Sequence, residues 1–263
     1  MEETLDSILL GIVQGLTEFL PVSSSGHLVL AQKLLNANLG QGILFEVAVH
    51  IATLVAILIF YRRRVTQLVY GTVTRNRQAL EYAGKLIVGT VPAIVIALLF
   101  RQWIEQQFNS LLVVGICLIL TGFIVWSTRF TIKNHCQGQN EPTWKAALLI
   151  GCVQAFAILP GISRSGSTVA AGLALGLKPL AAAEFSFMLG MFAMAGAGIL
   201  LLPELSNVQP GLMDTILLGS VAALLSGLLA LSAFVWLLRT QRFHVFAWYA
   251  WAMGAITVVW ALA

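Results

Sequence analysis

The residues of this chain that are best suited to chemistry lie in two short polar clusters. The first cluster spans residues 14–27 and combines Gln14 and Glu18 with three serines and His27. Gln14 and Glu18 are four residues apart and share one helix face, and Ser24 and His27, three apart, can meet in the same way. A carboxylate can hold a cation or move protons, and a histidine beside a serine can perform acid–base or nucleophilic chemistry.

The second polar cluster, residues 160–168, carries one guanidinium and four hydroxyl groups. Serines at the start of a helix stand beside free backbone N–H groups and the positive end of the helix dipole, which together bind anions. Arg164 adds a fork that matches phosphate oxygens. An arginine at the centre of a membrane helix costs roughly 2.5–3.5 kcal/mol, so we expect an anionic partner. Pairing of Arg164 with Glu18 alone is the alternative.

Each cluster contains residues that end one helix and can begin another. Pro21 and Pro160 end a helix, and the serines after them can cap the next one. Regions 5–36 and 144–177 are therefore each predicted to be a re-entrant hairpin of two half-helices. The phosphate-binding groups that we expect in the two breaks are Ser23, Ser25, Gly26, Ser163, Ser165, Gly166 and Thr168. A merely capped turn, with Glu18 paired to His27, is the structural alternative.

The composition places both clusters in a membrane. Of the 263 residues, 59% are hydrophobic and only 10% are charged, against roughly 25% charged in a soluble domain. The apolar runs are continuous rather than alternating, which favours helices over a lipid-facing barrel. We predict an all-α polytopic membrane protein that forms one domain over residues 1–263. Its six full spans are expected at 43–60, 86–100, 111–128, 182–202, 213–238 and 244–262.

The charged segments between the spans predict the orientation. Three basic segments fall on one side when the spans alternate: 61–85, 129–145 and 239–242. Short basic segments stay cytoplasmic, so the N-terminus and the first hairpin are predicted to face outward, and the site to open to the periplasm. The N-terminal MEETLDS has no basic stretch, so we expect no cleaved signal peptide. The net charge of +4 is spread over short segments and does not indicate nucleic-acid binding.

The two interrupted regions resemble each other. Residues 11–26 (GIVQGLTEFLPVSSSG) and 151–166 (GCVQAFAILPGISRSG) share Gly-x-Val-Gln and Ser-x-Ser-Gly at an offset of 140 residues. The spans that follow them run in opposite directions, which predicts an inverted-topology repeat with halves at about 5–128 and 144–262. In such repeats the two helix breaks meet near the membrane midplane and form the site there. An acid, a histidine, an arginine and helix N-termini at one place indicate phosphoryl transfer from a lipid phosphate.

The segments QGLTEFLPVSSSGH and PGISRSGST resemble the two signature motifs of the BacA-type undecaprenyl-diphosphate phosphatases. The similarity extends along nearly the whole chain, including EFSF at 184–187. It implies removal of the terminal phosphate from a C55 polyprenyl diphosphate in the bacterial inner membrane. This reaction recycles the lipid carrier for cell-wall synthesis, and overproduction of the enzyme is linked to bacitracin resistance. The family's catalytic positions fall on Glu18, Ser24, His27, Ser163, Arg164 and Thr168.

The resemblance also implies a divalent cation, Mg²⁺ or Ca²⁺, and no organic cofactor. The family's first acid position is Glu or Gln and is Gln14 here, so this chain offers one carboxylate, Glu18, rather than two. Whether Ser24, His27 or water attacks phosphorus stays open. We favour Ser24 with His27 as its proton-transfer partner, and Glu18 either orients His27 or holds the cation with Gln14.

Three other assignments were compared with this one. GISRSGST has Ser167 where a nucleotide-binding loop of the Walker A type needs lysine. The type 2 phosphatidic acid phosphatases need a histidine six residues after the arginine, and Ala170 stands there. A lipid-phosphate transporter or flippase remains the alternative, because inverted repeats are transporter architecture.

The glycine-rich stretch 190–198 permits close helix packing and is compatible with a homodimer.

Overall fold

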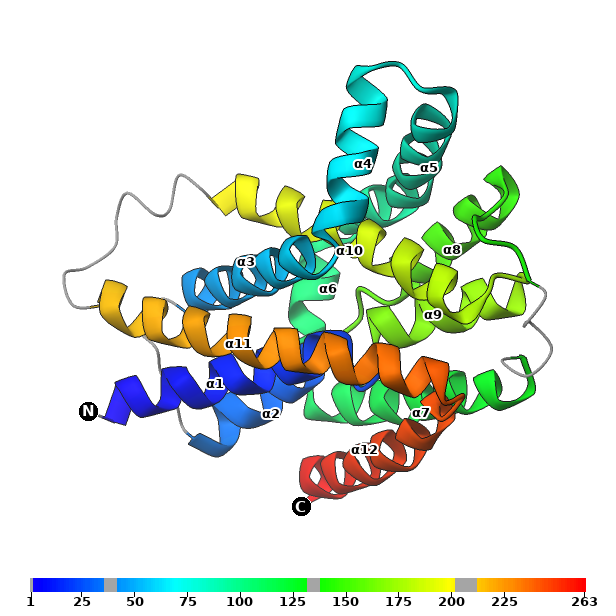
Figure 1. The fold of residues 1–263 in the computed structure, drawn as a ribbon. Coiled ribbons are helices and arrows are strands. Elements are labelled where there is room, and N and C mark those ends of the chain that lie inside the picture. The colour runs from blue at the N-terminus through cyan, green and yellow to red at the C-terminus, as the bar shows by residue number, and fades with distance from the viewer. Residues whose placement is uncertain (1, 36–41, 132–137, 202–211) are drawn as a thin grey trace.

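The computed structural model describes residues 2–35, 42–131, 138–201 and 212–263, and nearly all of them are helical (Figure 1). Within these ranges the only extended feature is an isolated bridge between Gln139 and Leu177. In chain order the helices are α1 (Glu2–Phe19), α2 (Ser24–Leu35), α3 (Gly42–Phe60), α4 (Arg62–Val73), α5 (Arg77–Leu99), α6 (Arg101–Gln107), α7 (Leu111–Thr131), α8 (Trp144–Phe156), α9 (Arg164–Ala174), α10 (Pro179–Leu201), α11 (Leu212–Arg239) and α12 (Phe246–Leu262).

Five of the described helices, α5, α7, α10, α11 and α12, are long and apolar enough to cross a membrane. A sixth span is reached if α3 and α4, which meet at an 82° bend, are counted as one. The prediction of a helical membrane protein is therefore confirmed. Part of the basic segment 129–145, including Lys133, lies outside the described residues.

The second predicted span begins earlier than expected. Helix α5 starts at Arg77 rather than at residue 86, and the basic segment 61–85 is a helical hairpin rather than a loop. Lys85 lies inside α5, where its ammonium group forms a 2.8 Å ion pair with Glu81 and stands 5.9 Å from the centre of the Trp144 ring. These two partners compensate the charge, so the lysine does not mark the end of a span.

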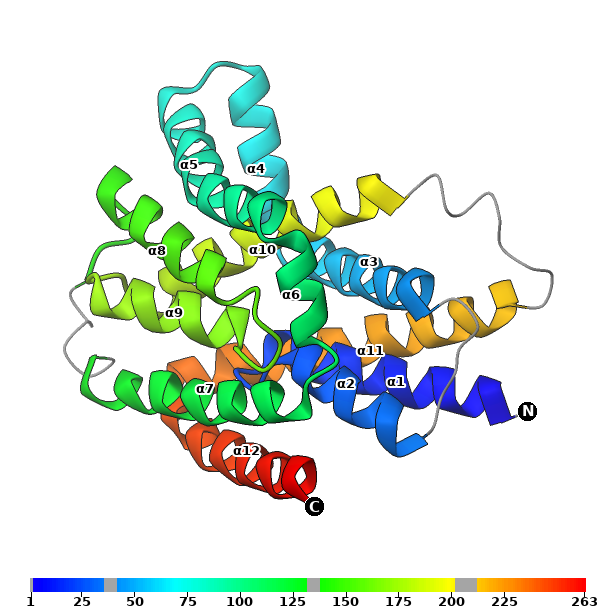
Figure 2. The same ribbon diagram turned by 180° about the vertical axis from the view of Figure 1, so that it is seen from behind.

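The long helices pack in pairs: α1 along α11, α5 along α8, and α7 along α12 (Figures 1 and 2). Glycines permit the closest of these contacts. A Cβ atom on Gly11 would lie 2.1 Å from the carbonyl oxygen of Gly219, and one on Gly151 would lie 2.3 Å from that of Gly89. Neither contact tolerates a side chain, so both helix pairs depend on glycine at these positions.

Both interrupted regions contain a break where the proline pattern predicts one. Helix α1 ends at Phe19, two residues before Pro21, and α2 begins at Ser24. Helix α8 ends at Phe156 and α9 begins at Arg164. Gly161 in the second break has a φ of +96°, a conformation that side chains other than hydrogen disfavour.

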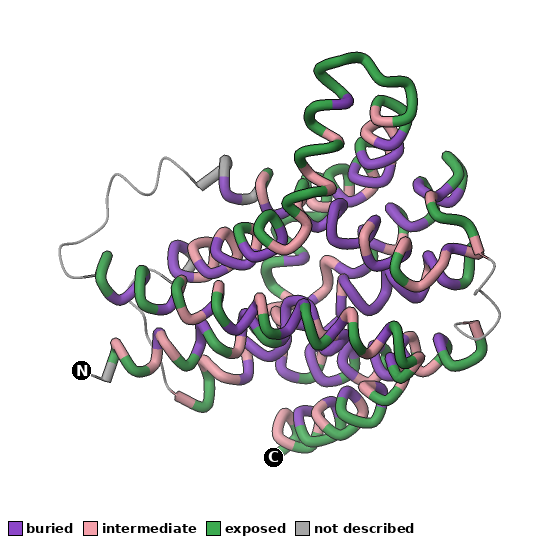
Figure 3. The backbone as a smooth tube through the Cα atoms, viewed as in Figure 1, coloured by how far each residue is buried: buried purple, intermediate pink, exposed green. Residues whose placement is uncertain are grey.

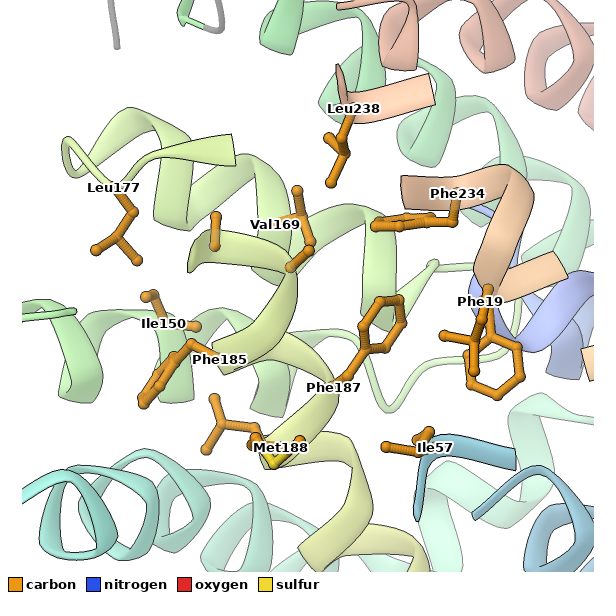
Figure 4. Close-up of a cluster of buried hydrophobic side chains, with 14 of the residues drawn as sticks. Phe19, Ile57, Ile150, Val169, Leu177, Phe185, Phe187, Met188, Phe234 and Leu238 are labelled. Atoms are coloured by element: carbon orange, nitrogen blue, oxygen red, sulfur yellow. The ribbon is translucent and has the colours of Figure 1, made fainter. Parts of the chain in front are cut away.

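Buried residues gather where the helices pack together (Figure 3), and the core beside these breaks includes packed phenylalanine rings (Figure 4). The Phe187 ring of α10 packs edge-on against Phe19 of α1 at 5.6 Å and against Phe234 of α11 at 4.9 Å between ring centres. All three side chains are fully buried. Because Phe19 follows Glu18 at the end of α1 and Phe187 follows Ser186 within α10, this cluster fixes the two helix segments that carry these polar groups.

Candidate active site

The two breaks touch each other inside the protein. A Cβ atom on Gly26, in α2, would lie 3.1 Å from the Cα atom of Gly161 in the second break. Reciprocally, one on Gly166, in α9, would lie 3.1 Å from Pro21 in the first break. The hydroxyl of Ser165 also donates to the carbonyl oxygen of Leu20 at 3.4 Å. The polar clusters, which are about 140 residues apart in sequence, therefore form one site.

Each half-helix after a break begins with a serine cap. The Ser23 hydroxyl accepts a hydrogen bond from the N–H of Gly26 at 3.3 Å, and the Ser163 hydroxyl accepts one from Gly166 at 3.0 Å. In both breaks the capping hydroxyl also lies beside the hydroxyl of the serine two residues later, Ser25 at 3.2 Å and Ser165 at 3.3 Å. These caps leave the hydroxyl of Ser24 free for another partner.

Glu18 is the centre of the site. Its Oε1 accepts a 2.8 Å charged hydrogen bond from the Arg164 guanidinium. Its Oε2 accepts hydrogen bonds from the Ser24 hydroxyl at 2.6 Å and from the Gln14 amide at 3.1 Å. The Nε2 atom of His50 lies 3.9 Å from the same oxygen. Glu18 is buried, whereas Ser24, Arg164 and His50 are partly exposed and accessible to a ligand.

Arg164 is held by more than its ion pair with Glu18. Its second terminal nitrogen donates to the carbonyl oxygen of Ser186 at 3.4 Å. Gly190, one turn further along α10, lies so close that a Cβ atom there would stand 1.8 Å from the guanidinium. The hydroxyl groups of Thr168 and Ser186 share a short hydrogen bond, in which either can be the donor. Helix α10 thus supports the arginine from the side opposite Glu18.

His27 is placed differently from the predicted pairing with Ser24. Its Nδ1 lies 2.8 Å from the carbonyl oxygen of Ser23, and its Nε2 lies 2.8 Å from the hydroxyl of Tyr249. Both ring nitrogens are therefore occupied, and the Ser24 hydroxyl donates to Glu18 instead. The spacing of three residues permits a Ser24–His27 contact, but the buried carboxylate is the stronger acceptor.

Three residues that the sequence did not assign to the site belong to it. His50 uses Nδ1 to contact the Glu46 carbonyl and turns Nε2 towards Glu18. Tyr249 contacts His27 from α12. Ser186 joins Arg164 and Thr168. The EFSF segment at 184–187 carried a sequence signal for Ser186.

Glu184 lies outside this site and pairs with residues of α4 and α5. Its carboxylate accepts a 2.8 Å hydrogen bond from Arg64 and a 3.4 Å hydrogen bond from the Tyr82 hydroxyl. Arg64 also pairs with Glu141 at 3.2 Å and stands 4.6 Å from the centre of the Tyr82 ring. This group of residues joins α4 and α5 to α10.

The donor atoms around Glu18 fit a divalent cation that shares its coordination with a substrate. The amide oxygen of Gln14 is buried and has no hydrogen-bond partner among the described residues, and oxygen is the ligand that Mg²⁺ and Ca²⁺ prefer. Within the same residues no group of three or more His, Cys, Asp or Glu side chains could hold a metal alone. Mg²⁺ is commonly held by one or two carboxylates together with substrate phosphates.

Comparison with known proteins identifies the family of this chain. The curated relatives named undecaprenyl-diphosphatase include those of Desulforapulum autotrophicum, 37% identical with 98% of both chains covered, and Desulfosudis oleivorans, 38% identical with 97% of this chain and 98% of the relative covered. The relative of Halothermothrix orenii is 36% identical with 98% of both chains covered. The family model described as bacitracin resistance protein BacA matches residues 7–256. This chain therefore belongs to the BacA family.

Proposed function

We propose that this protein is a membrane phosphatase that hydrolyses undecaprenyl diphosphate to undecaprenyl phosphate and inorganic phosphate. The observation that carries the proposal is the contact of Ser24, Glu18 and Arg164 at the junction of two helix breaks. It combines a nucleophile, a proton acceptor and a phosphate-binding fork in one place. The relatives named undecaprenyl-diphosphatase supply the substrate class.

In the proposed reaction the Ser24 oxygen attacks the terminal phosphorus and its proton moves to Glu18. The bond between phosphorus and the bridging oxygen breaks, and undecaprenyl phosphate leaves with that oxygen. Arg164 turns from Glu18 to the phosphoryl group, where its fork and the N-terminus of α9 stabilise the developing charge. Water then hydrolyses the phosphoserine and releases inorganic phosphate.

His27 has a supporting role in this proposal. Its contacts with the Ser23 carbonyl and the Tyr249 hydroxyl fix the ring beside the start of α2. We assign it to proton transfer at the leaving group, which requires that one of these contacts opens. A phosphohistidine is acid-labile and alkali-stable, whereas a phosphoserine is the reverse, so trapping of labelled enzyme distinguishes attack by Ser24 from attack by His27.

A divalent cation, Mg²⁺ or Ca²⁺, fits this proposal as a partner of the substrate. Glu18 and the amide oxygen of Gln14 would hold it, and its charge would lower the cost of bringing a diphosphate to a buried carboxylate. Removal of the cation with a chelator should then abolish phosphate release. Restoration by Mg²⁺ or Ca²⁺ supports the cation, and full activity in the chelator contradicts it.

The packing of the helices supports an inverted repeat. Helix α1 packs along α11 and α3 along α11, and their counterparts α8 and α10 both pack along α5. The glycine contacts follow the same exchange, because Gly11 with Gly219 corresponds to Gly151 with Gly89. We propose on this basis that α1–α2 and α8–α9 are re-entrant hairpins that enter the bacterial inner membrane from opposite sides.

The proposed site opens to the periplasm, where it would recycle the lipid carrier for cell-wall synthesis. Cysteine labelling tests this orientation after the three native cysteines have been replaced by serine. An impermeant reagent should label Ser110→Cys, between α6 and α7, in intact spheroplasts. Asn76→Cys, at the start of α5, should be labelled only after lysis, and the opposite pattern reverses the orientation.

Phosphate release from purified protein tests the activity itself. The protein should release inorganic phosphate from undecaprenyl diphosphate in detergent, and Ser24→Ala should be inactive with an unchanged unfolding midpoint. Binding or transport of the lipid without phosphate release would replace the phosphatase by a lipid-phosphate transporter.

A further inference from the structure

Helix α7 supports the second helix break. It lies beside α9 (Figure 2), and Cys117 of α7 and Ile162 of the break belong to one buried apolar cluster. The backbone of the break comes so close that a Cβ atom on Gly161 would overlap the carbonyl group of Val114 in α7. Residues 161–163 are buried, so their polar backbone groups need hydrogen-bond partners within the protein.

One side chain of α7 satisfies two of these backbone groups. The hydroxyl of Thr121 donates a hydrogen bond to the carbonyl oxygen of Gly161 at 2.8 Å. The same hydroxyl oxygen accepts a hydrogen bond from the N–H of Ser163 at 2.9 Å. Thr121 is fully buried, and its two partners stand on either side of Ile162. A single hydroxyl group therefore fixes the backbone of the break just before α9 begins.

The backbone that Thr121 holds leads directly into the phosphate-binding residues. The N–H of Ser163 is bonded to Thr121, and its hydroxyl caps Gly166. Its carbonyl oxygen accepts a hydrogen bond from the N–H of Ser167 at 2.9 Å. All of these polar groups of Ser163 are engaged, so the first turn of α9 has one position. Arg164 is the next residue and starts from that position.

We propose that Thr121 is a positioning residue, which holds the start of α9 so that Arg164 reaches the terminal phosphate of the substrate. The inference rests on the proposed function and extends it to a buried side chain outside the two polar clusters. Without the hydroxyl, the Gly161 carbonyl and the Ser163 N–H lose their partner, and the break must shift to find others. A misplacement of about 1 Å can cost about 10²-fold in rate when it moves a group that acts on the transition state.

The test compares two buried threonines of α7. Thr121→Val keeps the shape of the side chain and removes both hydrogen bonds, whereas Thr121→Ser keeps the hydroxyl. Thr128→Val is the matched control, because Thr128 is also fully buried and its hydroxyl donates to the Val125 carbonyl of its own helix. With undecaprenyl diphosphate we expect Thr121→Val to lower kcat/KM by at least about tenfold. Thr121→Ser and Thr128→Val should stay within a few-fold of the wild type. Equal activity of Thr121→Val and Thr128→Val, or an equal loss in Thr121→Ser, overturns the proposal.

A double-mutant cycle separates positioning of Arg164 from a general loss of structure. If Thr121 acts through Arg164, the effect of Thr121→Val should be much smaller in the Arg164→Lys variant than in the wild type, because both changes disturb the same interaction. An undiminished further loss would show that Thr121 acts independently of the arginine, and would contradict the assigned role.

A binding measurement separates this inference from the proposed function. Pyrophosphate, used as a probe of the phosphate-binding residues, should raise the thermal unfolding midpoint of the wild type and of Thr128→Val equally, and that of Thr121→Val by less. If the wild type releases no phosphate from undecaprenyl diphosphate, the phosphatase fails, and the pyrophosphate shift alone decides the role of Thr121. An equal shift in Thr121→Val, or no shift in the wild type, overturns the proposal. If Thr121→Val does not fold, Thr121→Ala is measured by the same criteria, because it removes the hydroxyl without placing a methyl group against the Gly161 carbonyl.

Discussion

The break between α1 and α2 and the break between α8 and α9 share a capping serine but differ in backbone conformation, because φ is +70° at Ser23 and −74° at Ser163. Both breaks contain a proline, both begin the next helix with a capping serine, and the two breaks lie against each other. The Ser23 cap and the Ser163 cap bond to glycines three residues later, and each lies beside a second serine. A proline and a capping serine therefore recur in both breaks, whereas the position with a positive φ differs: Ser23 in the first break and Gly161 in the second.

The chemistry of the two breaks differs at equivalent positions. Gln14, Glu18 and His27 in the first region correspond to Gln154, Ile158 and Ser167 in the second, at an offset of 140 residues. The amide of Gln14 donates to Glu18, four residues later. Ile158 cannot accept such a bond, and neither amide atom of Gln154 has a hydrogen-bond partner among the described residues. One break thus supplies the acid and the base, and the other supplies the arginine.

The sharpest difference between the breaks concerns their serines. We expect Ser24→Ala to lower kcat by at least about 10³-fold, because it removes the proposed nucleophile. Ser165→Ala, in the second break, should lower it only a few-fold, since its hydroxyl, among the described residues, contacts Ser163 and the Leu20 carbonyl alone. Phosphate release from undecaprenyl diphosphate measures both, and similar losses in the two variants would contradict the assigned roles.

The arginine of the second break tests whether the guanidinium fork is needed. Arg164→Lys keeps the charge but loses the fork, and we expect kcat/KM to fall by about 10²-fold. Arg64→Lys is the matched control, because Arg64 also pairs with a glutamate, Glu184, outside the site. It should keep kcat within a few-fold. Near-normal turnover of Arg164→Lys would reduce Arg164 to a structural counter-ion of Glu18.

A smaller effect is expected from the contact that fixes the histidine of the first break. Tyr249→Phe removes the hydroxyl that bonds to His27, and kcat should fall by about tenfold as the ring loses its orientation. Tyr70→Phe, at a hydroxyl on a 73% exposed side chain, should have no effect. If Tyr249→Phe has the same kcat as the wild type and the same pH dependence of kcat, the contact with Tyr249 does not support a role of His27 in catalysis.

The two glutamines provide the smallest and most local test. Gln154→Leu replaces buried amide atoms that lack partners with a side chain of similar size, and the free energy of unfolding should rise by about 1–3 kcal/mol. Activity should not change. Gln14→Leu should instead reduce activity, because it removes a hydrogen bond to Glu18. Thermal unfolding in detergent and phosphate release check both, and a loss of stability in Gln154→Leu would show that its amide has a partner in the membrane.

The sequence by itself determined the features that depend on neighbouring residues. Long apolar runs predict membrane helices, and prolines followed by serines predict the two breaks, because both are local properties of the chain. The paired motifs identified the BacA family, which the family model and the curated relatives confirm. The polar clusters at residues 14–27 and 160–168 are likewise visible without a structure.

Only the tertiary structure decided which of these groups meet. Ser24 is near both Glu18 and His27 in sequence, and helix spacing alone permits either partner. Packing of distant helices makes the choice: Arg164, 146 residues from Glu18, holds the carboxylate beside Ser24, and Tyr249, 222 residues from His27, holds the imidazole elsewhere. His50 enters the site in the same way, from α3. Local spacing limits the possible pairs, but long-range packing selects among them.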